Sequence, residues 1–151
     1  MLMLTVAILP VMAYAAPDVV EIMKVTEDGA RVRQGPSSSY EVITSCKEGD
    51  CVFYLGKTKE AFCYVRTSKG KIGYMYKGFL KSYGAANKSQ IYYAKKSVKV
   101  YKKASTGSRK VMKLSKNQHV IVYSTKGSWA YIKTLSGKGG YVKTSSLKKA
   151  S

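Results

Sequence analysis

The chain contains the same sequence pattern twice. Residues 25–81 and 93–148 share it in the same order, with an offset of roughly 68 positions. The clearest matching segments are 62–65 with 129–132, and 73–74 with 140–141. A fixed internal period means that one structural unit is used twice, so the sequence predicts two modules of about 60 residues, each large enough to fold alone.

Both copies carry strand signals rather than helix signals. Short β-branched and aromatic runs alternate with polar, glycine-containing turns every 8–12 residues, and no segment keeps a period of 3.6 residues. We therefore predict an all-β fold. The small, polar segment 83–91 is interpreted as a linker between one module at 17–82 and another at 92–151.

Positive charge is concentrated in the second half of the chain. Residues 18–84 hold 11 Lys or Arg and all 8 Asp or Glu, whereas residues 85–151 hold 16 Lys or Arg and no acid. A moderate excess of lysine keeps edge strands soluble and unpaired, but the complete absence of acid suits contact with polyanions. The second module is therefore predicted to favour an anionic partner.

The N-terminus is typical of a secretion signal. Residues 1–12 are almost wholly apolar, and Ala13-Tyr14-Ala15 offers a cleavage site, although no Lys or Arg precedes the apolar run. The run is too short to span a bilayer. A buried N-terminal strand is the alternative, which the change to polar sequence at Asp18 disfavours. We predict a signal peptide at 1–16 and a secreted protein.

All three cysteines lie in the first copy. Cys46 and Cys51 flank a predicted hairpin turn, which would place them opposite each other for a disulfide. The alternative is three free, mostly buried thiols. Because the number is odd, Cys63 or another cysteine stays unpaired in either case.

The segment 31–36, with the sequence RVRQGP, resembles the signature of the bacterial SH3 family, the SH3b modules of secreted and cell-wall proteins. The turn at 47–50, the aromatic segment at 62–65 and the closing segment at 73–75 also resemble that family. The second copy keeps the segments at 129–132 and 139–142, but its signature loop has diverged. The resemblance implies a partly open SH3-like barrel of five or six strands per copy. It also implies a binding or targeting role, commonly toward peptidoglycan and commonly beside a catalytic domain.

Several residues are expected to shape the barrel rather than to bind. Gly35 would supply a φ that other residues resist, and Pro36 would stiffen the following loop. Arg33 would tie loop carbonyls together through its five donors. Gly73 and Gly140 would let strands approach closely.

Tyrosine is the prominent aromatic residue, with 13 copies against 1 Trp and 3 Phe. Tyrosine is amphipathic and suits surfaces that bind peptides or sugars, although about half of these residues are expected only to fill the core. Phe62 and Trp129 are expected in the core or on a groove floor. The candidate groove residues are Tyr40, Tyr54, Tyr64, Tyr74, Tyr76, Tyr101, Tyr123, Trp129, Tyr131 and Tyr141.

The sequence offers no catalytic constellation. Its one histidine, His119, is expected to face solvent on a strand edge, and no acid in its module could orient it. No metal-ligand cluster or phosphate-cradling loop is evident, so we predict a protein that is not an enzyme and needs no cofactor or metal.

These observations favour a secreted, non-catalytic protein that binds the bacterial envelope. The first module would bind a peptide or glycan of peptidoglycan, and the second an anionic wall polymer such as teichoic acid. The alternatives are an extracellular protein–protein interaction module and the targeting fragment of a cell-wall hydrolase. Nucleic acid binding would fit the charge and the tyrosines, but the signal peptide argues against it.

Overall fold

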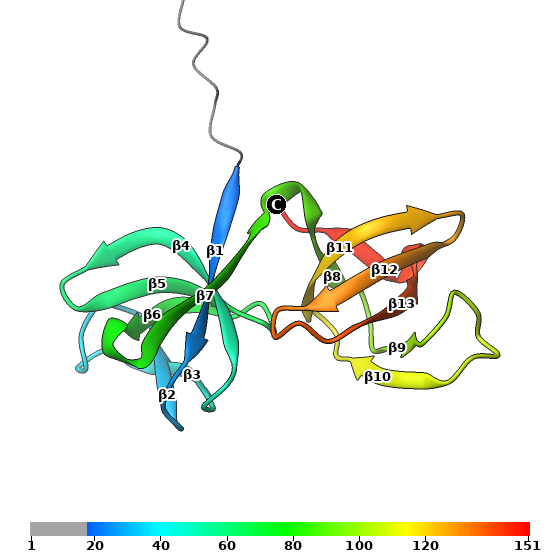
Figure 1. Cartoon of the computed structure of the whole chain (residues 1–151). Helices are drawn as coiled ribbons and strands as arrows, with labels where there is room; N and C mark the ends of the chain where they lie inside the picture. Colours follow the sequence, from blue (N-terminus) through cyan, green and yellow to red (C-terminus); the bar gives the residue numbers. More distant parts are fainter. Residues whose placement is uncertain (1–17) are drawn as a thin grey trace, which may run out of the picture.

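The computed structural model describes residues 18–151, so the signal peptide predicted at 1–16 lies outside the described residues. This part of the chain forms two separate sheets of seven strands each and no α-helix (Figure 1). No helix within it is long and apolar enough to cross a membrane. The all-β prediction is confirmed.

The first sheet follows the strand order β3-β2-β6-β5-β4-β1-β7. Its strands are β1 (Val19–Val25), β2 (Ala30–Arg33), β3 (Val42–Cys46), β4 (Cys51–Lys59), β5 (Phe62–Thr67), β6 (Ile72–Tyr76) and β7 (Leu80–Asn87). A 3-10 turn, η1 (Lys77–Phe79), connects β6 to β7. The sheet curls without closing, so the module is a partly open barrel of seven strands rather than five or six.

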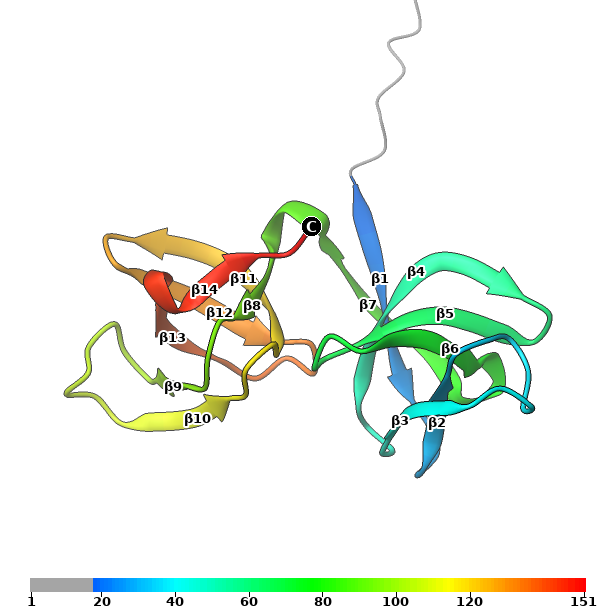
Figure 2. The same ribbon diagram turned by 180° about the vertical axis from the view of Figure 1, so that it is seen from behind.

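The second sheet follows the order β10-β9-β13-β12-β11-β8-β14, which is the order of the first sheet shifted by seven strands. Its strands are β8 (Ile91–Ala94), β9 (Val98–Tyr101), β10 (Lys110–Leu114), β11 (His119–Lys126), β12 (Trp129–Thr134), β13 (Gly139–Lys143) and β14 (Leu147–Lys149). A 3-10 turn, η3 (Thr144–Ser146), again precedes the last strand. The repeat seen in the sequence is therefore one topology built twice (Figure 2).

The segment expected to be a linker is mostly regular structure. Residues 83–87 belong to β7, which pairs antiparallel with β1 along the length of both strands. The 3-10 turn η2 (Lys88–Gln90) then leads directly into β8. The connection is short because β7 completes the first sheet before the chain turns into the second module.

Each module has its own core of inward-facing side chains. On β5, Cys63, Val65 and Thr67 are buried and alternate with outward-facing residues, as the period of two in a strand requires. On β12, Ala130 and Ile132 take the equivalent inward positions. The burial of such apolar side chains is the main favourable contribution to the free energy of folding.

Gly73 and Gly140 lie where strands approach closely. A Cβ at Gly73 would lie 2.5 Å from the carbonyl oxygen of Arg33, and one at Gly140 would lie 2.5 Å from Cγ1 of Val100. Both distances are far below van der Waals contact. A side chain at either position would push β2 from β6, or β9 from β13.

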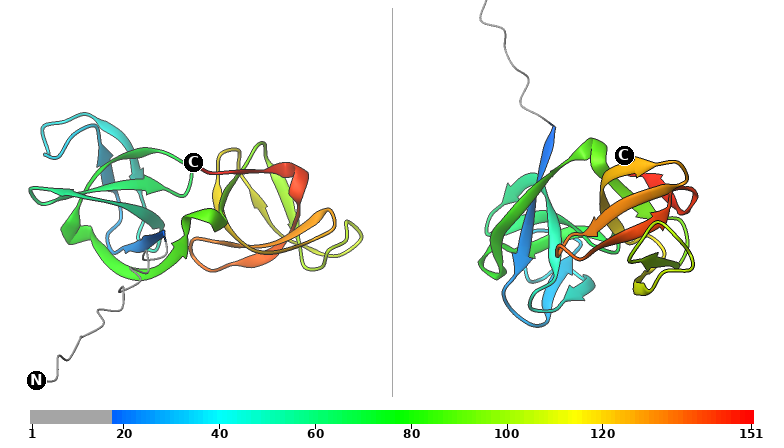
Figure 3. Two further views of the ribbon diagram at one scale, coloured as in Figure 1. Left: turned by 90° about the horizontal axis from the view of Figure 1, so that it is seen from above. Right: turned by 45° about the vertical axis from the view of Figure 1, so that its right-hand side comes forward.

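A third apolar cluster joins the two modules, which lie side by side in Figure 3. It combines Phe53 and other residues of the first module with Ile91, Ile121 and Leu135 of the second. Across the same junction, the backbone N–H of His119 donates a 2.7 Å hydrogen bond to the carbonyl of Ser68. The phenol of Tyr83 donates to the carbonyl of Ser136 at 3.1 Å. The modules are therefore packed against each other.

Candidate functional site

The outward face of β5 and β6 carries a row of aromatic cross-strand pairs. Phe62 lies opposite Tyr76, and Tyr64 lies opposite Tyr74. The ring centroids are 5.9 Å apart in the first pair and 4.9 Å in the second. Because the inward positions of these strands fill the core, the aromatic rings form a surface on the other side of the sheet.

The second module repeats this row on β12 and β13. Tyr131 lies opposite Tyr141 with ring centroids 5.1 Å apart, and Trp129 lies opposite Lys143. The Nζ atom of Lys143 is 4.6 Å from the centroid of the Trp129 ring. The same two strands of each module thus present the same kind of face. In the second module, Lys143 takes the position that Tyr76 has in the first.

Lysines also lie beside the other aromatic rings of these faces. In the first module, Nζ of Lys57 is 5.8 Å from the Tyr64 centroid and 5.9 Å from that of Tyr74. In the second, Nζ of Lys133 is 5.2 Å from the Tyr123 centroid. A flat aromatic surface next to a cation suits ligands that combine C–H groups with a negative charge.

A hollow of about 440 Å³ opens at the end of the first aromatic row. Phe62, Tyr76 and Phe79 form its apolar side, and the centroids of Tyr76 and Phe79 are 5.2 Å apart. Arg31 and Arg33 form its basic side. The hollow can therefore hold an apolar group and a carboxylate or phosphate together.

The loop that follows β2 and contains Gly35 and Pro36, called here the signature loop, is held by two contacts. The Nη1 group of Arg33 donates a 2.8 Å hydrogen bond to the carbonyl of Tyr40, the contact that a loop clamp requires. Gly35 does not adopt a positive φ, contrary to expectation. Its lack of a side chain instead makes room for the Tyr40 ring, whose Cδ1 would lie 2.5 Å from a Cβ at this position.

The remaining tyrosine candidates occupy different places. Tyr40 covers Gly35, and Tyr54 packs against the core while its hydroxyl is 2.8 Å from that of Thr58. Tyr101 packs edge-on against Trp129 with centroids 5.9 Å apart, so it extends the second aromatic row. Tyr123 is 51% exposed and lies 6.4 Å from Tyr131, measured between ring centroids. The structure therefore gathers Tyr64, Tyr74 and Tyr76 on one face, and Tyr101, Tyr123, Trp129, Tyr131 and Tyr141 on the other.

Sequence reasoning missed several members of these faces. Phe62, which was expected in the core or on a groove floor, points outward and lines the hollow, whereas Phe79 and the lysines were not singled out. The period of two could have placed Phe62, because it alternates with the buried Cys63 and Val65. Phe79 carries no such signal because it lies in η1, outside any strand.

Most of the positive charge of the second module is not neutralised within the protein. Among residues 18–151 there is one ion pair, between Lys88 and Asp18 at 2.7 Å, and it lies near the junction. On β9 and β10, the side chains of Lys99 and Lys110 lie close together, and the nearby charged group of Lys99 lowers the pKa of Lys110. Two ammonium groups held this close form a surface that attracts anions.

The cysteines are free and buried, and no Cys46–Cys51 disulfide is present. The two residues belong to different clusters, because Cys46 packs inside the first barrel and Cys51 packs into the junction. Burial, followed by the charge of Asp50, raises the pKa of Cys46 to about 11. Burial also raises the pKa of Cys51. Both are therefore protonated and unreactive at neutral pH.

His119 is not the solvent-facing residue that the sequence suggested. It is only 7% exposed because the first module covers its end of β11. Its Nδ1 atom is 2.9 Å from the carbonyl of Asn117, and no described cysteine or carboxylate orients the ring. Within the described residues, no group of three or more His, Cys, Asp or Glu side chains could hold a metal ion.

Two segments, 28–81 and 96–148, match the family model of the bacterial SH3 domain. These segments cover most of the chain, so the protein belongs to the bacterial SH3 domain family with two tandem modules. Bacterial SH3 domains are binding modules, and they commonly bind cell-wall peptidoglycan. No curated protein sequence matches the chain.

Three solved structures are similar over much of the chain. NlpC2 from Trichomonas vaginalis is 15% identical, with a TM-score of 0.38, over 89% of this chain and 50% of that one. NlpC1 from the same organism is 17% identical, with a TM-score of 0.37, over 98% and 51%. An NlpC/P60 family protein from Bacillus cereus is 12% identical, with a TM-score of 0.38, over 85% and 56%. The chain thus spans about half the length of each.

Proposed function

We propose that this chain is a secreted, non-catalytic protein that binds the bacterial cell envelope through both modules. The observation that carries the proposal is the aromatic face repeated on β5–β6 and β12–β13, next to lysines in each module. An exposed aromatic row with a cation beside it matches a peptide or glycan of peptidoglycan, which presents C–H surfaces and carboxylates.

The second module adds a polycationic surface for an anionic wall polymer such as teichoic acid. Support for this comes from the absence of acid after residue 85 and from the adjacent ammonium groups of Lys99 and Lys110. Two weak sites on one chain gain strength because binding at the first raises the effective concentration at the second.

A pulldown of residues 17–151 on purified Gram-positive walls, with and without teichoic acid, tests this function. At about 0.5 M salt the Debye length is only about 4 Å, so the polymer-dependent part should be lost. Binding to stripped walls should remain because aromatic contact is not screened. Absence of binding to either preparation would overturn the proposal and favour a protein partner.

Single substitutions assign stripped-wall binding to the aromatic face. Tyr64→Ala and Tyr131→Ala each remove an outward ring at the same position of the repeat, and each should lower affinity by about tenfold. Val42→Ala, which trims an exposed apolar side chain on β3, is the matched control. Equal binding by Tyr64→Ala, Tyr131→Ala and the control would show that the face is not used.

A further inference from the structure

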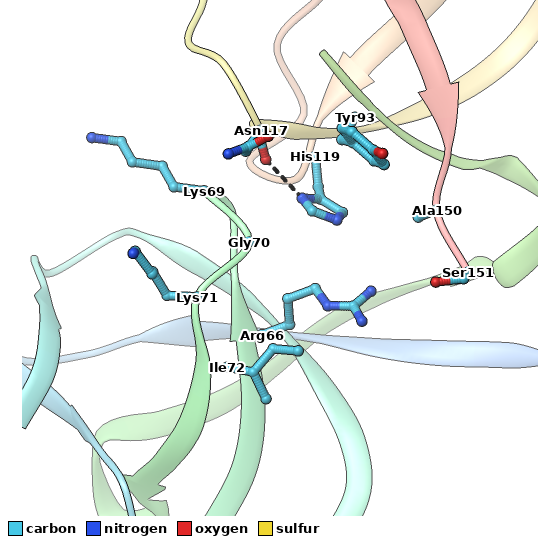
Figure 4. Close-up of a pocket in the computed structure, with 10 residues that line it drawn as sticks. All are labelled: Arg66, Lys69, Gly70, Lys71, Ile72, Tyr93, Asn117, His119, Ala150 and Ser151. Carbon is cyan, nitrogen blue, oxygen red and sulfur yellow. Dashed lines mark hydrogen bonds between the residues drawn. The ribbon is translucent and has the colours of Figure 1, made fainter. Parts of the chain in front are cut away.

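A cavity of about 300 Å³ lies between the two modules, and both of them line it (Figure 4). The first module contributes β5, β6 and the turn between them. The second contributes β8, β11, the turn before β11 and the C-terminal residues. Its lining includes Arg66, Lys69, Lys71, Tyr93, Asn117 and His119.

The cavity is basic and holds no acidic side chain. Arg66 extends the outward row of β5 beyond Tyr64 and is only half-exposed, whereas Lys69 and Lys71 lie in the following turn and at its end. None of the three forms an ion pair with a described carboxylate. A half-buried guanidinium without a counter-charge is costly unless an anion can reach it.

His119 completes the wall opposite Arg66. Its imidazole is held by the ring of Tyr93, with centroids 5.6 Å apart, and by that of Phe53, at 6.2 Å. Because the carbonyl of Asn117 can only accept, Nδ1 carries the proton and donates the 2.9 Å hydrogen bond. The remaining nitrogen, Nε2, faces the cavity toward the guanidinium of Arg66 (Figure 4).

The equivalent position in the second module shows that this site belongs to the junction. Lys133 takes the place of Arg66 in the repeat, on the outward side of β12. There the Nζ atom of Lys133 lies 5.2 Å from the centroid of the Tyr123 ring, within its own module. The cluster around Arg66 thus exists only because the second module faces it.

We propose that this interdomain cavity is a binding site for a tetrahedral oxyanion, the phosphate group of a mono- or diester, held between Arg66 and His119. Donors that converge from two modules suit a tetrahedral anion better than a planar carboxylate. The site is separate from the aromatic faces and does not depend on wall binding. A ligand here holds the modules in one arrangement, because it contacts both.

Binding is coupled to the protonation of His119. In the free protein, burial lowers the pKa of His119, the hydrogen bond to Asn117 raises it and the charge of Arg66 lowers it. The other groups that face the ring are Tyr93 and Phe53. Ser151 also lines the cavity, whereas the ammonium groups of Lys69 and Lys71 point away from it (Figure 4). A bound anion offsets the positive charges, so it raises the pKa of His119, and affinity rises as pH falls.

Nuclear magnetic resonance can follow the protonation of His119 directly, because the chain has 1 histidine and therefore one imidazole signal in a tag-free protein. The probe is sulfate, whose charge does not change near neutral pH, titrated at constant ionic strength against chloride. We expect a saturable change in the His119 signal and a higher pKa with sulfate bound. Glycerol phosphate and inorganic phosphate should saturate the same signal, whereas acetate should not.

Charge-matched variants separate this site from general attraction. Arg66→Gln should weaken sulfate binding by about tenfold, because a charge-assisted hydrogen-bonding partner is lost. Lys126→Gln removes the same charge at the far end of β11. Lys126 lies seven residues after His119, which is about 23 Å along a strand at about 3.3 Å per residue. The Lys126→Gln variant should bind sulfate as the wild type does. Circular dichroism checks that both variants are folded.

The outcomes are distinct. A saturable pKa shift that Arg66→Gln weakens and Lys126→Gln preserves supports the site. Equal loss in both variants would show attraction to net charge and overturn it. Equally tight binding of acetate would overturn the assignment to a tetrahedral anion, and an unchanged His119 signal at high sulfate would overturn the site itself.

Discussion

The ring of Phe53 in the first module packs edge-on against the imidazole of His119 in the second, with centroids 6.2 Å apart. Phe53 is 1% exposed and belongs to the apolar cluster that continues into Ile121 and Leu135. The junction is therefore a small core of its own. The free energy of packing at this junction decides whether the two modules unfold together.

Leu135→Ala should uncouple the modules. Leu135 is 3% exposed in the junction cluster, and removal of such a side chain costs about 2–5 kcal/mol. Trp129 is the one tryptophan and reports only on the second module, whereas circular dichroism reports on both. The two urea transitions should coincide in the wild type and separate in Leu135→Ala. Ile132→Ala, a deletion inside the second barrel, controls for simple loss of stability, and superimposed transitions in Leu135→Ala would contradict the prediction.

Stability should fall as pH drops below the ordinary pKa of histidine. Burial, the largest effect, lowers the pKa of His119 in the folded chain, so the unfolded chain binds the proton more readily. The stabilising contribution is complete above about pH 6.5 and is lost as pH falls toward the folded-state pKa. Its slope cannot exceed about 1.4 kcal/mol per pH unit. Urea unfolding at about pH 7.5 and about pH 5 should show this loss in the wild type and less of it in His119→Gln.

Gly73→Ala and Gly140→Ala should each destabilise the protein by about 1–3 kcal/mol, because the new methyl group would overlap Arg33 or Val100. Gly84→Ala is the control within a strand, since a Cβ there meets nothing within 4 Å. Thermal unfolding measures all three variants. Equal melting temperatures for Gly73→Ala and Gly84→Ala would show that the strands can separate without cost.

The three thiols should resist alkylation in the folded protein. All are buried, and the pKa of about 11 for Cys46 keeps it protonated at mildly basic pH. Iodoacetamide should add three groups in denaturant and few or none under native conditions, as counted by mass spectrometry. A denatured, unreduced chain that takes up only one group would reveal a disulfide and contradict the structure.

Part of each aromatic face could be predicted from residue type and from the alternation of side chains along a strand. Tyr64 and Tyr74 could be proposed as binding residues because exposed strand tyrosines suit recognition. Phe62 could have been added from its alternation with Cys63. Tyr40 could not be separated from this group, because its packing over Gly35 depends on how the signature loop folds back.

Two tandem all-β modules, their common strand pattern and the imbalance of charge could all be predicted from the amino-acid sequence. These properties reside in turns, glycines and alternating side chains that act over a few residues and occur twice. The folded chain was needed to show that β7 returns along β1, that His119 is buried and that Arg66 faces it across a cavity. Those features depend on contacts between residues distant in the chain, whose burial is set when the sheets curl and the modules pack together.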